Sequence, residues 1–236
     1  MSAAQEALDK AEALDGYRAA CAASRCNSVA RKDQVYAPTF LEKDDLQRLM
    51  ITLYSIPIAK KMDIVVMHST ADNGFPHTRP NSLICMPKSS IIDSTDAEIY
   101  ETICHEAYHV HQRRNPDLWY KKCLKEGWTP VEPPQSHVER CRINPDTFYK
   151  NRFWAWDKVH IPLPLFVQED YATLDGVVVK WLDTRNMVTY SDPPSSFTAR
   201  YGSSATQPEH PYELLAVEYA AEKIIKEEEL LKKLEE

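Results

Sequence analysis

The residues with the clearest chemical potential stand together at His105-Glu106-Ala107-Tyr108-His109, an H-E-x-x-H pattern. Residues four apart in an α-helix lie one above the other on one face, so both imidazoles can bind a single metal ion. The pattern is typical of zinc sites in which the glutamate acts as a general base toward the metal-bound water. We therefore predict that His105 and His109 bind Zn²⁺ and that Glu106 is the catalytic base.

A third ligand is expected, because a catalytic zinc ion usually has three protein ligands and keeps one position for water. The downstream side chains that could serve are Glu126, Glu132, His137, Glu169, Asp170, Glu213 and Glu218. Glu126 and Glu132 are disfavoured because a glycine or proline follows each closely, so neither is held rigidly on a helix. Glu218 falls on the polar side of the last helix, together with Glu222.

Glu213 is the preferred third ligand because of its place on that last helix. On a helical wheel it shares the apolar stripe formed by Val217, Ala220, Ile224 and Leu231. A carboxylate in such a stripe carries a desolvation penalty that a bound cation would offset. The alternative interpretation is an ordinary first-turn glutamate, favoured there by the helix dipole.

The two helices that must position these ligands have recognisable ends. Thr95 and Glu98 form a capping-box pattern, which predicts a helix over 96–114 that ends at Asn115-Pro116, where a short helix over 116–126 begins. Pro211 is typical of a helix start, and no helix breaker follows it up to residue 234. His111 falls on another face of the first helix and is not expected to bind the metal.

Further elements are predicted from periodicity and composition. Helices are expected over 3–25 and 44–54, and strands over 63–69, 82–87, 161–168 and 176–182. Pro80 and Pro87 flank the second strand, which favours an edge position for it, because proline cannot donate to a ladder. Residues 127–211 are rich in proline and aromatic residues, and the four tryptophans in this stretch are expected in the core rather than on a partner surface.

Composition excludes several classes of protein. The five glycines are too far apart for a phosphate-binding loop, and a net charge of −7 opposes nucleic-acid binding. No apolar run is long enough to span a bilayer or to act as a secretory signal, so no membrane partner and a cytoplasmic location are expected. The six cysteines are then expected to be reduced.

The length fits a single domain, with one lobe over 1–114 and a second over 115–236.

The chain resembles the zincin metallopeptidases of the gluzincin type. These enzymes combine an H-E-x-x-H helix with a glutamate on a later helix, often in an E-x-x-A pattern, and Glu213-Leu214-Leu215-Ala216 is similar to it. The resemblance covers residues 63–114 and 208–225. It implies an α+β fold with a small mixed sheet, and it places an antiparallel edge strand just before the active-site helix, at Ser82–Pro87. An extended substrate would pair with Ser82–Met86 there.

The same resemblance bears on the residue that stabilises the oxyanion. Members similar to lethal factor carry a tyrosine seven residues before the ligand glutamate, whereas this chain has Thr206 at that position. Tyr201, His210 and Tyr212 are the candidates to replace it.

The implied function is zinc-dependent hydrolysis of peptide bonds in a peptide or protein substrate. The alternative is a zincin-like scaffold that has lost catalysis and acts as a binding or structural protein. A third interpretation is that the motif is accidental and its histidines are ordinary helix residues.

Overall fold

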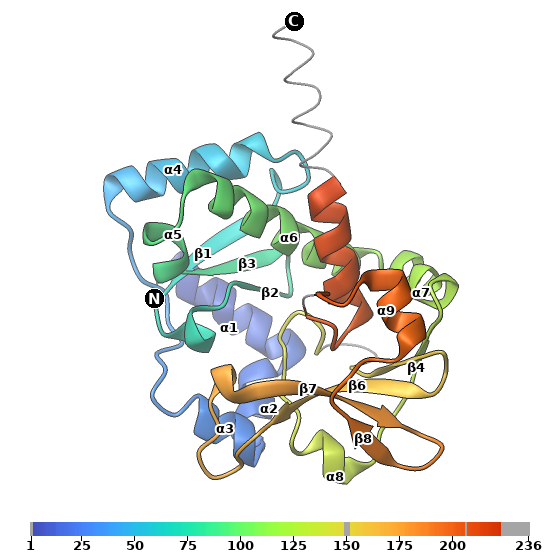
Figure 1. Ribbon diagram of the computed structural model, residues 1–236. Coiled ribbons are helices and arrows are strands. Elements are labelled where there is room, and N and C mark those ends of the chain that lie inside the picture. The colour runs from blue at the N-terminus through green and yellow to red at the C-terminus, as the bar shows by residue number, and fades with distance from the viewer. Residues whose placement is uncertain (1, 149–151, 206, 223–236) are drawn as a thin grey trace, which may run out of the picture. The chain divides into compact units, whose positions relative to one another are not determined.

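The computed structural model describes residues 2–148, 152–205 and 207–222, and it separates into two compact units. The first unit comprises Met1–Ala11, Val35–Arg114 and Leu215–Glu236. The second comprises Glu12–Gln34 and Asn115–Leu214. Each unit has a β-sheet with helices beside it (Figure 1), so the protein is α+β, as predicted.

The first unit contains a three-stranded mixed sheet in the order β1-β3-β2. β1 and β3 are parallel, and β2 is antiparallel to β3, with His77 opposite Cys85. The strands are β1 (Asp63–Met67), β2 (His77–Arg79) and β3 (Leu83–Pro87). The helices are α1 (Ala3–Asp15), which belongs to this unit up to Ala11, the 3₁₀ helix η1 (Ala71–Gly74), α4 (Lys43–Ser55), α5 (Ser89–Ile92) and α6 (Asp96–Arg114).

β3 lies at the centre of this sheet, so the prediction of an edge strand at residues 82–87 is wrong. Ile84 and Met86 pack in one apolar cluster with α4 and α6, while Leu83 and Cys85 pack in another with α1. A strand covered on both faces has a continuous apolar sequence, as this one does. The two prolines do not interrupt the ladder, because Pro80 precedes the strand and Pro87 is its last residue.

The antiparallel edge strand is β2, which lies between the segments 63–69 and 82–87, both predicted as strands. All three of its residues are buried, although His77 is ionisable and Arg79 is charged. A prediction that looks for apolar residues therefore does not recognise this strand. The expected pairing of a substrate with Ser82–Met86 is therefore also wrong, since both neighbours of β3 are strands of the protein.

The predicted helix over residues 3–25 is divided into two shorter helices, and a third follows them. α1 ends at Asp15, and Gly16 has a φ of +61°, in the left-handed region that a helix does not use. α2 (Tyr17–Ala23) and α3 (Arg25–Ala30) follow, separated by Ser24 in an extended conformation. A single glycine thus ends an otherwise continuous alanine-rich pattern.

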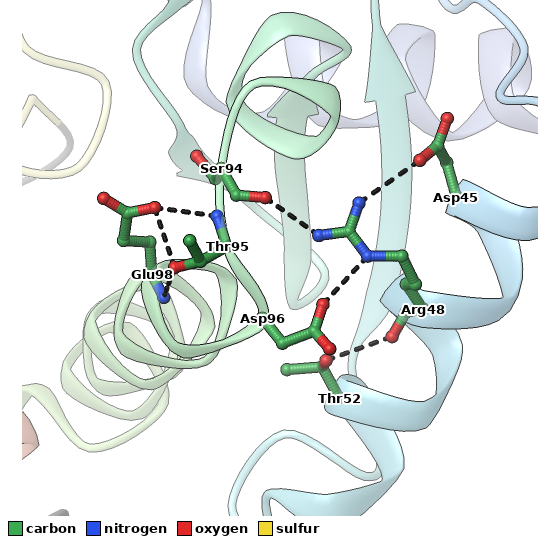
Figure 2. A network of polar contacts seen from close by, with 7 residues as sticks. All are labelled: Asp45, Arg48, Thr52, Ser94, Thr95, Asp96 and Glu98. Carbon is green, nitrogen blue, oxygen red and sulfur yellow. Dashed lines mark hydrogen bonds and ion pairs between the residues drawn. The ribbon is translucent and has the colours of Figure 1, made fainter.

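The start of α6 is fixed by the predicted capping box (Figure 2). Thr95 N–H donates to Glu98 Oε2 at 2.7 Å, and Glu98 N–H donates to Thr95 Oγ1 at 3.3 Å. Arg48 of α4 adds a second attachment, because it donates to the Ser94 carbonyl and to Asp96 Oδ1, each at 2.8 Å. The helix that carries the H-E-x-x-H motif is thereby held at its first turn.

The second unit contains a five-stranded antiparallel sheet in the order β4-β5-β6-β7-β8. Trp128, Trp154, Trp156 and Trp181 are all buried, as expected for core residues. The strands are β4 (Trp128–Pro130), β5 (Trp154–Trp156), β6 (His160–Phe166), β7 (Val177–Asp183) and β8 (Val188–Tyr190). The helices, besides α2 and α3, are α7 (Pro116–Lys125), α8 (Gln135–Val138), η2 (Leu174–Gly176) and α9 (Ser195–Tyr201).

The last helix is described over residues 211–222, and its predicted continuation to 234 lies outside the described residues. The boundary between the two units falls within it, after Leu214. The six cysteines are buried, and none of them forms a disulfide within the described residues. Of the helices in the described ranges, none is long and apolar enough to cross a membrane.

Candidate metal centre

Three of the predicted site residues lie together as a group that could hold a metal ion. His105, His109 and Glu213 each offer one ligand atom, and these atoms lie within 4.8 Å of one another. His109 and Glu213 are each 1% exposed, and His105 is half-buried. The donors are two imidazole nitrogens and a carboxylate oxygen, a set that suits Zn²⁺.

The two histidines meet because α6 is regular where they lie. Their Nε2 atoms are 2.9 Å apart and their ring centroids 4.6 Å apart, so both rings direct the same nitrogen toward one point. The apolar residues of the same helix pack into the core of the first unit, and they include Ile99, Ile103, Ala107 and Val110. α6 therefore has one face for packing and another for ligands.

Gln112 fixes the tautomer of His109. The Nδ1 of His109 lies 2.8 Å from Gln112 Oε1, and an amide oxygen can only accept, so Nδ1 carries the hydrogen. The Nε2 of His109 then offers a lone pair, toward which His105 directs an Nε2–H. A metal ion would take the place of this proton, which is the usual linkage between metal binding and proton release.

Glu213 is fixed by an amide as well. Asn144 Nδ2 donates to Glu213 Oε1 at 2.7 Å. The helix begins at this point, since the N–H groups of Glu213 and Leu214 both donate to the His210 carbonyl. An amide satisfies an oxygen without cancelling its charge, so the carboxylate keeps its attraction for a cation.

Contacts inside the first unit show how this helix reaches the histidines. Tyr219 packs its ring against Tyr108 of α6 at 5.6 Å, and Ala220 belongs to the apolar cluster that contains Ile103 and Ala107. Ala220 lies seven residues after Glu213, hence about 20° around the helix from it. The face that carries Glu213 is therefore the face that packs against α6.

One part of the predicted apolar stripe is wrong. Val217 is 37% exposed, whereas Ala216 and Ala220 are buried. On the helical wheel these two alanines lie to one side of Glu213, and Val217 lies to the other side. Ile224 and Leu231 lie outside the described residues.

The other candidate third ligands do not join the group. Glu126 pairs with Arg200 and Glu169 with Arg140, at 2.8 and 2.9 Å, and Asp170 pairs with Arg25. Glu132 and Glu218 are exposed. His137 is in α8, and His111 is half-buried, with a pKa lowered by burial and by Arg114.

The three candidates for oxyanion stabilisation are placed as follows, and their role stays a prediction. Tyr201 accepts a hydrogen bond from Trp128 Nε1 at 3.0 Å. His210 is buried, and its Nδ1 accepts from the Tyr212 N–H at 3.1 Å, which leaves the hydrogen on Nε2 as a donor. Tyr212 is buried with its ring against Trp154. Thr206 lies outside the described residues.

Sequence reasoning missed the residues that support the ligands. Glu209 is buried beside Glu213, and Arg142 donates to it at 2.5 Å. Burial raises the pKa of Glu209, the charge of Glu213 raises it further, and Arg142 lowers it. The spacing of four residues between Glu209 and Glu213 gives no helical signal, because Glu209 precedes the helix that begins at residue 211. Arg142 and Asn144 carry no signal either, because they lie in an irregular stretch with no periodicity.

Comparison with known proteins gave no match to any family model, curated protein or solved structure. What the site can do therefore has to follow from its own residues.

Proposed function

We propose that the protein is a zinc-dependent metallopeptidase. The observation that carries this proposal is the convergence of His105, His109 and Glu213 within 4.8 Å, in a chain where Glu106 follows the first ligand directly. Two neutral imidazoles and one carboxylate leave a divalent zinc ion with net positive charge, which favours catalysis over a purely structural site. The resemblance to the gluzincin motifs supports the same class.

The residues around the site have separable roles in this proposal. Zinc bound there would acidify water and polarise the carbonyl of a peptide bond. Glu106 is buried on α6, about 100° around the helix from His105, and it would accept the proton of that water and pass it to the leaving nitrogen. His210, with a neutral ring and a hydrogen on Nε2, is a suitable donor toward a developing oxyanion.

The edge strand β2 lies beside the helix that carries the two histidines. Arg113 donates to the carbonyl and to Oγ1 of Thr78 in this strand, at 3.4 and 3.2 Å. Arg113 lies four residues after His109, so it shares the ligand face of α6. β2 therefore runs beside that face as a buried strand, and its Thr78 carbonyl is occupied by Arg113.

The decisive test is Glu106→Gln, which removes the base and keeps the shape of the side chain. We expect the variant to retain its zinc content but to lose at least about 100-fold in kcat/KM on a cleaved peptide. Zinc is measured by elemental analysis, and cleavage by a screen of a peptide library. Glu101→Gln, an exposed position on the same helix, is the matched control and should behave as wild type.

Full activity in Glu106→Gln would contradict the proposal. Wild-type protein that binds zinc but cleaves no peptide would favour the alternative of a zincin-like scaffold. Absence of zinc, with stability unaffected by chelators, would favour an accidental motif.

A further inference from the structure

We propose that Asn144 is a positioning residue for the third ligand: it holds Oε1 of Glu213, so that this carboxylate binds the metal through the single oxygen Oε2. The inference rests on the proposed metal site and adds a residue that no motif marks. Asn144 would set the orientation of the Glu213 carboxylate without binding the metal itself.

The first support is the geometry of the contact itself. The bond from Asn144 Nδ2 to Glu213 Oε1 is 2.7 Å long, at the short end of the range for hydrogen bonds to an ionised acceptor. The orientation of the amide is settled by its other end, because Asn144 Oδ1 accepts the N–H of Asp146 at 3.0 Å. An amide turned the other way would lose both bonds.

The second support is the rigidity of the segment that carries Asn144. The N–H of Ile143 donates to Asn27 Oδ1 at 2.9 Å, and the carbonyl of Ile143 accepts from Arg31 Nη2 at 3.0 Å. Both partners belong to or directly follow α3, and both are buried. The N–H of Arg142 donates to the Pro164 carbonyl in β6 at 2.8 Å. The backbone just before Asn144 is thus attached to a helix and to a strand of the same unit.

The third support is that Glu209 and Glu213 have hydrogen-bond partners of different charge. The charged Arg142 donates to Glu209, whereas the neutral amide of Asn144 donates to Glu213. A cation on Glu209 neutralises a buried charge that has no role as a ligand. An amide on Glu213 orients the carboxylate and leaves its negative charge for a metal ion.

One consequence concerns the number of bonds to the metal. A carboxylate that bound through both oxygens would compete with Asn144 for Oε1, and this would weaken a short hydrogen bond in a buried place. Binding through Oε2 alone keeps that bond. With the two imidazole nitrogens, it would supply three protein ligand atoms, the number usual for a catalytic zinc site.

The test uses Asn144→Ala, which removes the Nδ2 donor without placing a second carboxylate beside Glu213. Zn²⁺ affinity is measured by competition with a chromophoric chelator, and the visible spectrum of the Co²⁺-loaded protein reports coordination number and geometry. We expect an affinity about 10- to 100-fold weaker than that of wild type, together with a changed cobalt spectrum. Neither readout depends on peptidase activity.

Asn186→Ala is a closely matched control. Asn186 also accepts the N–H of the residue two positions later with its Oδ1, and it also donates through Nδ2 to another side chain, Tyr190, but it lies exposed before β8. This variant should leave the affinity and the cobalt spectrum unchanged. If Asn144→Ala does not fold by circular dichroism, Asn144→Ser provides the same comparison.

Wild-type affinity and an unchanged cobalt spectrum in a folded Asn144 variant would overturn the positioning role while leaving the metal site intact. Wild-type protein that binds neither Zn²⁺ nor Co²⁺ would overturn the metal site and this inference with it.

Discussion

At the scale of single residues, the candidate site depends on neutral amides that orient its ligands. Gln112 accepts from His109 Nδ1, and Asn144 donates to Glu213 Oε1, so two of the three candidate ligands have one polar atom held by an amide. Such partners also raise the basicity of a ligating imidazole. His109 and Glu213 would therefore need little reorientation when a metal ion binds.

Gln112→Leu tests this arrangement on the histidine side. The variant keeps a side chain of similar size but removes the acceptor of the His109 Nδ1–H, so a buried donor is left unsatisfied and the ring loses its fixed orientation. We expect Zn²⁺ affinity to fall about 10- to 100-fold in chelator competition. Gln5→Leu is the control, since Gln5 makes a helical bond to Asp9 outside the site. Equal affinity of Gln112→Leu and wild type would rule the role out.

The sequence reveals the ligands more readily than their supports. His105 and His109 stand four apart, and helical geometry alone brings them together. Gln112 is three residues beyond His109 and could be found by the same reasoning. Asn144 could not, because its contact with Glu213 depends on how an irregular segment is held by Asn27 and Arg31, and no local pattern encodes such long-range contacts.

At the scale of elements, α6 was predictable in both its limits and its faces. Its ends follow from a capping box and from Asn115-Pro116, which are local signals. The sheet was less predictable, because the place of β3 depends on the helices that cover its two faces. β2 has only three residues and carries polar side chains, so it lacks the alternation by which strands are recognised.

The cap of α6 gives a prediction about pH. Hydrogen bonds from the backbone N–H and then from the hydroxyl of Thr95 lower the pKa of Glu98 below its ordinary 4.5. A carboxyl with a lowered pKa in the folded state stabilises the fold above its unfolded pKa, and this stabilisation is lost as the pH falls through the folded value. Glu98→Gln should therefore melt below wild type at pH 7.

The difference between Glu98→Gln and wild type should shrink as the pH falls below 4.5, where wild type loses the same interaction. Melting temperatures across a pH series measure it. Glu101→Gln removes an exposed carboxylate of the same helix outside the cap, and it should show no such convergence. A gap between Glu98→Gln and wild type that stayed constant down to pH 3 would contradict the role of the cap charge.

At the scale of the whole molecule, Glu213 is distant in the chain from His105 and His109. A metal ion would therefore bind all three residues only in the folded protein. A ligand specific to the native state stabilises it by about 2.7 kcal/mol at a free concentration of 100 times its dissociation constant. For a chain of this length such a gain corresponds to a rise of roughly 5–10 °C in melting temperature. Stability thus reports metal binding without any knowledge of a substrate.

We expect zinc to raise the melting temperature of chelator-treated wild-type protein by this amount, and Glu213→Ala to abolish the rise because it removes a ligand. Glu218→Ala, on an exposed position of the same helix, should keep the full rise. Differential scanning calorimetry of the three proteins with and without zinc makes the comparison. An undiminished rise in Glu213→Ala would mean that zinc binds elsewhere, for example through the cysteines, and would remove Glu213 from the ligand set.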